Sequence, residues 1–175
     1  NTMITVYAQI GHLQEARGMF KAMPEPDTVS WNALLAAYAQ NGHLLEASVF
    51  FRMMPEKDGF KPDAVTTIAM LSACIHKGLV ERGRGLFLAM EGDHGVAPKQ
   101  AHFRCMVSVL GRAGQLGRAE ELSKTMPFVA DSIVWTALLD SCRAQGDERR
   151  AMPVAESLAK SEPGDAAPYL LLSSI

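Results

Sequence analysis

The stretch WNALLAAYAQNGHLLEASVFFRMMP, residues 31–55, contains two apolar stripes that are separated by Asn41-Gly42. The first stripe consists of Trp31, Leu34, Leu35 and Tyr38, and the second consists of Leu44, Ala47, Phe51 and Met54. Spacings of three and four residues place each set on one face of a helix. Glycine ends a helix without a Cβ clash, and proline disfavours its continuation. The stretch therefore predicts a helical hairpin whose second helix ends at Pro55.

The glycine of this hairpin recurs in the same local frame along the chain, at intervals of 31, 36, 36 and 32 residues. The five glycines are Gly11, Gly42, Gly78, Gly114 and Gly146. A small residue follows each of them five positions later, namely Ala16, Ala47, Gly83, Ala119 and Ala151. Small residues let paired helices approach closely, and self-similarity at this period is typical of solenoids. We expect an all-α fold, a right-handed α-solenoid of stacked antiparallel helix-turn-helix repeats.

Composition and charge exclude several classes of protein. The chain has 48% hydrophobic residues but no apolar run near the ~20 residues of a membrane span, so no membrane contact is expected. The net charge of −2 gives no overall attraction to nucleic acid, so phosphate contacts would need a local basic strip. Cys74, Cys105 and Cys142 lack Cys-x-x-Cys spacing and are expected to fill the core. No metal or cofactor is predicted.

Three segments carry a resemblance to a known family: VSWNALL at 29–35, LSACIHKGLV at 71–80 and CMVSVLGRAG at 105–114. They resemble the pentatricopeptide repeats of land plants, in the variant that alternates long and short motifs. The resemblance implies the following units: 1–27 a truncated short (S) repeat, 28–63 a P-type repeat, 64–99 an L-type repeat, 100–131 the final S-type repeat, 132–165 an E-type motif and 166–175 a truncated second E-type motif. Since both terminal units are incomplete, we expect a piece of a longer protein.

In the family that this chain resembles, the fifth residue of a repeat and its last residue together select one RNA base. This implies two base-selecting pairs, Asn1 with Asp27 and Asn32 with Asp63. An Asn/Asp pair is similar to the family's uracil-preferring combination, and an amide offers a donor and an acceptor to a pyrimidine edge. Two adjacent uridines are therefore expected. The second residue of a repeat flanks the base in this family, which implies a base-sandwiching role for Val29, Val65 and Ala101.

Three further pairs are expected to select bases more weakly: Ile68 with Lys99, Arg104 with Asp131, and Thr136 with Asp165. The first pair carries no amide or hydroxyl for a base edge. The second is expected to form an internal ion pair, and the third lies in the extension, so no base is assigned to it. Candidate phosphate contacts are Lys77, Arg84, Arg112 and Arg118.

A purely structural interpretation stays open for several of these residues. Aspartate is a favoured helix N-cap, and Asp27 and Asp63 each precede a predicted helix. Asn32, in contrast, lies within a predicted helix, where asparagine is unfavourable, and this favours a functional role. Trp31 and Trp135 occupy one register of the repeat, which favours packing over base stacking.

The chain lacks the His-x-Glu and Pro-Cys-x-x-Cys pattern of deaminases, and it has no phosphate-binding glycine loop or nucleophile elbow, so no enzyme activity is expected. The resemblance implies an RNA-binding module of a C-to-U editing factor that binds single-stranded organellar RNA in mitochondria or chloroplasts. Residues 132–175 are expected to contact editing-factor proteins or a deaminase, and the truncated ends are expected to allow self-association. A tetratricopeptide-like, protein-binding scaffold is the alternative, although its constant spacing of about 34 residues is not found.

Overall fold

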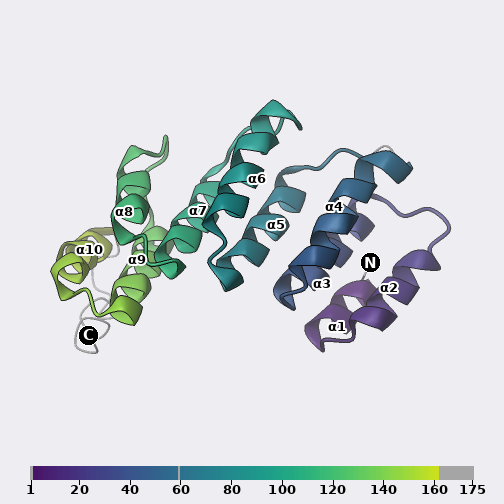
Figure 1. The fold of residues 1–175 in the computed structure, drawn as a ribbon, viewed down its shortest axis with the longest axis horizontal. Helices are drawn as coiled ribbons and strands as arrows, with labels where there is room; N and C mark the ends of the chain where they lie inside the picture. The colour runs from purple at the N-terminus through teal and green to yellow at the C-terminus, as the bar shows by residue number, and fades with distance from the viewer. Residues whose placement is uncertain (1, 59, 162–175) are drawn as a thin grey trace.

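The computed structural model describes residues 2–58 and 60–161, apart from the side chains of 55–58 and 77. These residues form ten α-helices and no strand: α1 (Thr2–Gln9), α2 (Leu13–Lys21), α3 (Thr28–Gln40), α4 (Leu44–Asp58), α5 (Ala64–Lys77), α6 (Val80–Gly92), α7 (Gln100–Arg112), α8 (Leu116–Thr125), α9 (Ser132–Gln145) and α10 (Glu148–Ser161). Short turns join them into five antiparallel hairpins, which lie side by side in chain order (Figure 1). The expected all-α solenoid is confirmed.

The hairpin turns depend on glycine, as α5 illustrates. This helix ends where Gly78 adopts a φ of +59°, in the left-handed region. The Gly78 amide then donates to the Ile75 carbonyl oxygen at 3.2 Å, and the Leu79 amide donates to the Cys74 carbonyl oxygen at 3.1 Å. These bonds satisfy carbonyl groups that the helix leaves without partners, and they turn the chain back. The glycine frame read from the sequence therefore marks real helix ends.

The helices form two unequal layers. We call α1, α3, α5, α7 and α9 the first helices, and their partners α2, α4, α6, α8 and α10 the second helices. Each first helix packs against the next one, so the first helices form a continuous layer. Within the described part of the chain, no second helix packs against another second helix. The layer of first helices is therefore the tighter, inner side of the stack.

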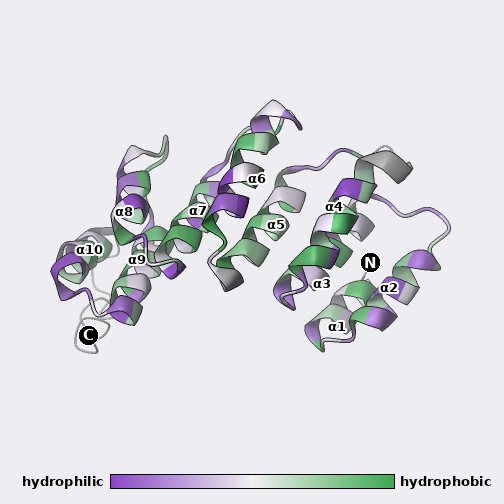
Figure 2. Cartoon of the chain, in the orientation of Figure 1, coloured by the Kyte–Doolittle hydropathy of each residue, from purple (hydrophilic) through white to green (hydrophobic). Residues whose placement is uncertain are grey.

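The hydrophobic core runs along the whole stack, from Ile4 in α1 to Leu158 in α10. Figure 2 shows hydrophobic residues along α3 and α5, whereas α10 carries more hydrophilic ones. Trp31 is only 1% exposed, and its ring centroid lies 4.8 Å from that of Phe20 and 5.8 Å from that of Phe50. The packing interpretation of Trp31 is thus confirmed. The three cysteines are also buried as expected, and burial raises the pKa of each thiol.

One boundary prediction is wrong. Helix α4 runs to Asp58 and so continues past Pro55. Proline removes one helical hydrogen bond, but its fixed φ is itself helical, so a packed helix can continue through it. The same happens at Pro153 inside α10.

None of the helices in residues 2–58 and 60–161 is long and apolar enough to cross a membrane.

Candidate nucleic-acid interface

The candidate site lies where α3 and α5 begin, in the layer of first helices. Asn32 is the fifth residue of α3, and Asp63 is the residue that directly precedes α5. Although 31 positions separate them in sequence, the Asn32 Nδ2 donates a hydrogen bond to the Asp63 Oδ1 at 3.2 Å. Packing of α3 against α5 brings the two groups together. The amide and the carboxylate of consecutive hairpins therefore share one place on the surface of the stack.

Asp63 also has the structural role that its position predicts. It is the N-cap of α5, because its Oδ1 accepts a hydrogen bond from the Thr66 backbone amide at 2.9 Å. In return, the Asp63 backbone amide donates to the Thr66 Oγ1 at 3.1 Å, which completes a capping box. Capping and contact with Asn32 use the same carboxylate oxygen, so the two interpretations of Asp63 are compatible.

The Asn32 amide is held at both ends. Its Nδ2 donates to Asp63, and its Oδ1 accepts a hydrogen bond from the Thr66 Oγ1 at 2.6 Å. Asn32 is 9% exposed, whereas Thr66 is fully buried behind it. An amide nitrogen carries two hydrogens and an amide oxygen two lone pairs, so one donor and one acceptor position remain for a ligand. The residue Thr66 was missed in the sequence, because a threonine three positions after an aspartate indicates only a helix cap.

The charge of Asp63 is stabilised by this network. Burial raises the pKa of the Asp63 carboxyl, but hydrogen bonds from the Thr66 backbone and hydroxyl and from the Asn32 amide outweigh burial and lower the pKa below its usual value. A carboxylate with a lowered pKa in the folded state adds stability above the pKa of the unfolded chain, and this stability is lost as the pH falls through the folded-state pKa.

We therefore expect Asp63→Asn to reduce the acid sensitivity of the protein. Asparagine keeps a capping oxygen but does not titrate. The free energy of unfolding, measured by urea denaturation at several pH values below about 5, should fall more steeply with decreasing pH for the wild type than for the variant. Parallel pH profiles would contradict the stabilising role assigned to the Asp63 charge.

The predicted base-sandwiching residues differ in exposure. Val29 and Val65 are the second residues of α3 and α5, and they are 59% and 58% exposed. Apolar residues of the stripes, such as Leu34 and Leu35, are in contrast completely buried. Ala101, the second residue of α7, is half-buried. The two valines thus offer apolar surface beside the candidate site that the core does not use.

The first predicted pair is described only in part, because Asn1 lies outside the described residues. Asp27 caps α3: its Oδ1 accepts from the Ser30 amide at 2.7 Å, and Ser30 Oγ lies 2.7 Å from the same oxygen. This arrangement repeats the capping of α5 by Asp63. In the extension, Thr136 is half-buried in α9, and its predicted partner Asp165 also lies outside the described residues.

Arg104 and Asp131 form the expected ion pair. The Arg104 Nη2 contacts the Asp131 Oδ2, and Asp131 also caps α9 through the Val134 amide at 3.2 Å. The Arg104 Nε is buried and has no hydrogen-bond partner among the described residues. Arg104 is the fifth residue of α7, so its guanidinium occupies the position that the Asn32 amide has in α3, two hairpins earlier.

Ile68 and Lys99 are not brought into a comparable contact. Ile68 is half-buried, and Lys99, the residue before α7, is exposed. The buried His102 takes over the local hydrogen bonding, since its Nδ1 accepts from the Lys99 amide at 2.9 Å and its Nε2 donates to the Ala64 carbonyl oxygen at 3.1 Å. Because Nδ1 accepts from an amide and Nε2 faces a carbonyl oxygen, the hydrogen of the neutral His102 ring is assigned to Nε2. The Ile68 and Lys99 side chains carry no amide or hydroxyl that could offer both a donor and an acceptor to a base edge.

A groove of about 1240 Å³ lies over the C-terminal ends of α5, α7 and α9. Its charged lining residues are Glu81, Arg82, Arg112, Asp140 and Arg143. Arginines outnumber acidic residues only slightly, so the groove is weakly basic.

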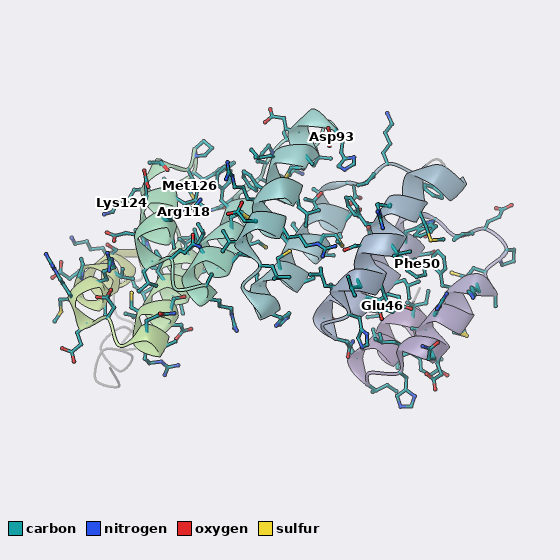
Figure 3. The ribbon with its side chains drawn as sticks, in the orientation of Figure 1. Glu46, Phe50, Asp93, Arg118, Lys124 and Met126 are labelled. Atoms are coloured by element: carbon teal, nitrogen blue, oxygen red, sulfur yellow. The ribbon has the colours of Figure 1, made fainter. Side chains whose placement is uncertain are left out.

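The four candidate phosphate contacts are spread over the molecule. Arg112 lines the groove, whereas Arg84 and Arg118 line a smaller cavity of about 220 Å³ that involves α6, α7 and α8. Figure 3 labels Arg118 on α8, in the layer of second helices. The side chain of Lys77 lies outside the described residues. Arg84, Arg112 and Arg118 therefore do not line one common basic strip.

Comparisons with known proteins agree with this architecture. Models of the pentatricopeptide repeat match residues 26–76 (PPR repeat family) and residues 1–25 and 65–94 (PPR repeat), so together they cover 1–94. The chain is 44% identical, over all 175 residues, to the pentatricopeptide repeat-containing protein At2g13600 of Arabidopsis thaliana. It is 40% identical over 173 residues to the chloroplastic protein ELI1 and 39% identical over 175 residues to the mitochondrial protein At3g53360, both of the same plant. It spans about a quarter of these relatives, 25%, 27% and 23% of their lengths.

Solved structures show the same fold. The pentatricopeptide repeat protein PPR10 from maize matches 99% of this chain and 31% of its own, with 20% identity and a TM-score of 0.59. PPR10 in complex with an 18-nucleotide psaJ RNA element matches 93% of this chain and 26% of its own, with 16% identity and a TM-score of 0.64. The repeat frame, the stacked hairpins and these matches lead to one conclusion: the chain belongs to the pentatricopeptide repeat family.

Proposed function

We propose that this chain is a sequence-specific module for single-stranded RNA that reads one base per repeat. The observation that carries the proposal is the contact between Asn32 and Asp63, which joins the fifth residue of one repeat to its last residue across two hairpins. The chain's family includes PPR10, whose solved complex contains an RNA element. Family membership favours RNA over the peptide ligand of a tetratricopeptide-like scaffold.

The Asn32 amide has the chemistry that a pyrimidine edge requires. Its remaining N–H and lone pair can pair with an acceptor and a donor on the same base edge. Val29 and Val65 contribute exposed apolar surface on which the faces of the base can pack. Asn1 with Asp27 and Asn32 with Asp63 would then read two adjacent uridines, one for each repeat.

The finer assignment concerns the class of the protein and its partners. We assign 28–63, 64–99 and 100–131 to P-, L- and S-type repeats, and 132–175 to an E-type extension, as in organellar C-to-U editing factors. In this role the repeats would hold the transcript near the target cytidine, and the extension would contact a deaminase that lies elsewhere. Relatives named chloroplastic and mitochondrial support an organellar location.

RNA binding provides the direct test. The chain should bind a short adenosine-rich RNA that contains two adjacent uridines more tightly than the same RNA with two cytidines, by about 1–3 kcal/mol per base. Fluorescence anisotropy at several salt concentrations separates base recognition from phosphate contacts. Phosphate contacts weaken with salt for both RNAs, whereas the preference for one base over the other does not depend on them. Equal affinity for the two RNAs would refute the base assignment, and no binding at low salt would refute RNA recognition by this chain.

A further inference from the structure

The hydroxyl of Thr66 lies behind the candidate base-reading site and has no access to a ligand. Thr66 is fully buried, and its Oγ1 lies 2.6 Å from the Asn32 Oδ1 and 2.8 Å from the Asp63 Oδ1. The Asp63 backbone amide donates to the same Oγ1 at 3.1 Å. A hydroxyl has a single hydrogen, so the Asn32 and Asp63 oxygens share it, and the shorter of the two contacts is the one to Asn32. Thr66 therefore acts on Asn32 from the inside of the stack.

The orientation of the Asn32 amide decides which pyrimidine it can bind. Rotation of the amide by 180° exchanges its donor and its acceptor. Uracil presents an N3–H donor beside carbonyl acceptors, whereas cytosine presents an N3 acceptor beside an amino donor. For a base that is held in one position, the two orientations of one asparagine are therefore complementary to different bases.

Two contacts fix this orientation, and they are unequal in geometry. The Asn32 Nδ2 to Asp63 Oδ1 distance of 3.2 Å is at the long end for an N–H···O bond. The Thr66 Oγ1 to Asn32 Oδ1 distance of 2.6 Å is short for an O–H···O bond. The contact of the Thr66 hydroxyl with the amide oxygen is thus shorter than the contact of Asp63 with the amide nitrogen. The hydroxyl donates a hydrogen to the amide oxygen, which the Asp63 carboxylate cannot do.

We propose that Thr66 is a positioning residue that fixes the Asn32 amide in the orientation that accepts uracil and rejects cytosine. The inference rests on the proposed function, because it presupposes that Asn32 reads a base. It places a specificity determinant in the third residue of the following repeat.

The sequence places a hydroxyl residue after the other Asn/Asp pair as well. The third residues of the helices α3, α5, α7 and α9 are Ser30, Thr66, His102 and Val134. Along the sequence, a hydroxyl residue follows each of the two Asn/Asp pairs. Val134, which has no side-chain donor, follows the pair in which Arg104 contacts Asp131 directly.

The test compares three variants of the whole chain: Thr66→Val, Thr66→Ser and Thr67→Val. Valine has nearly the shape of threonine without its hydroxyl, and serine restores the hydroxyl. Thr67 is an equally buried neighbour whose Oγ1 donates to the Asp63 backbone carbonyl at 2.9 Å, so Thr67→Val is the matched control. Thr66→Ala is a second variant without the hydroxyl, for use if the valine variant folds poorly.

Dissociation constants are measured for adenosine-rich RNAs with UU, UC or CU at the centre, so that each position is tested separately. At one of the two positions, the preference for uracil over cytosine should fall by a factor of about 3 to 10 in Thr66→Val and return in Thr66→Ser. Thr67→Val should keep the wild-type ratio. A loss of folded protein reduces binding to all RNAs equally and cancels in this ratio, so a merely structural role of Thr66 would leave the ratio unchanged.

The outcomes separate the inference from the proposed function. If the wild type binds the three RNAs equally, base reading by the Asn/Asp pairs is refuted. If the wild type discriminates and Thr66→Val keeps its ratio within twofold, the positioning role of Thr66 is refuted while base reading stands. The same conclusion follows if Thr67→Val changes the ratio as much as Thr66→Val does.

Discussion

Replacing Trp31 by alanine is expected to lower the free energy of unfolding by about 3–5 kcal/mol. Trp31 belongs to α3, is 1% exposed, and packs against Phe20 of α2 and Phe50 of α4. Its side chain therefore connects three helices of two hairpins, and truncation would leave a large cavity. Urea denaturation monitored by circular dichroism measures the loss. Leu45→Ala, on the same hairpin but 73% exposed, is the control and should change the free energy of unfolding by less than about 0.5 kcal/mol.

The solenoid architecture predicts where the loss will appear. Each hairpin contacts only its neighbours, so stability is a sum of local terms and interface terms. Because Trp31 and Trp135 are the chain's two tryptophans, fluorescence of the Trp31→Ala variant reports only on α9. In this variant, the helical circular dichroism signal should start to fall at a lower urea concentration than the Trp135 fluorescence signal starts to change. A loss below about 1 kcal/mol would contradict the assignment of Trp31 as the anchor of the first two hairpins, and a single coincident transition would contradict the local unfolding of these hairpins.

The fold was largely predictable because its rules are local. Helix ends depend on glycines with positive φ, and helix faces depend on the spacing of apolar residues, and both are visible in the stretch 31–55. Both signals recur in the five repeats of the sequence, which strengthens the prediction from any single repeat. The end of α4 was not predictable in this way. Proline disfavours a helix only by a limited energy, and whether packing outweighs that energy depends on neighbours that the local sequence does not reveal.

The candidate site was predictable as a pair but not as a network. The resemblance to the repeat family paired Asn32 with Asp63 and Arg104 with Asp131, and the opposite charges of the second pair indicated an ion pair. Thr66 was not found, since its contact to Asn32 spans 34 residues and its role in the helix cap fully explains its local sequence. His102 was missed for the same reason, because its bond to the Ala64 carbonyl joins the starts of α5 and α7.

Replacing Asn32 by alanine is expected to abolish the preference for uridine at one position of the RNA, which corresponds to about 1–3 kcal/mol of discrimination. Alanine offers no donor or acceptor to a base edge, while Asp63 keeps its capping bonds to Thr66, so α5 should still begin normally. Preference at the neighbouring position should persist, because each base is read by a different pair. Dissociation constants for RNAs with UU, UC and CU measure both preferences.

Asn41→Ala is the matched control for this prediction. Asn41 follows α3 at its other end, and its Nδ2 donates across hairpins to the Ala8 carbonyl oxygen at 3.0 Å and within its own hairpin to the Ala37 carbonyl oxygen at 2.8 Å. Its loss should reduce stability by a similar amount without changing which base is preferred. If Asn32→Ala retained the uridine preference, or if Asn41→Ala lost it to the same extent, the Asn32–Asp63 contact would be a stabilising bond between hairpins and not a site that reads a base.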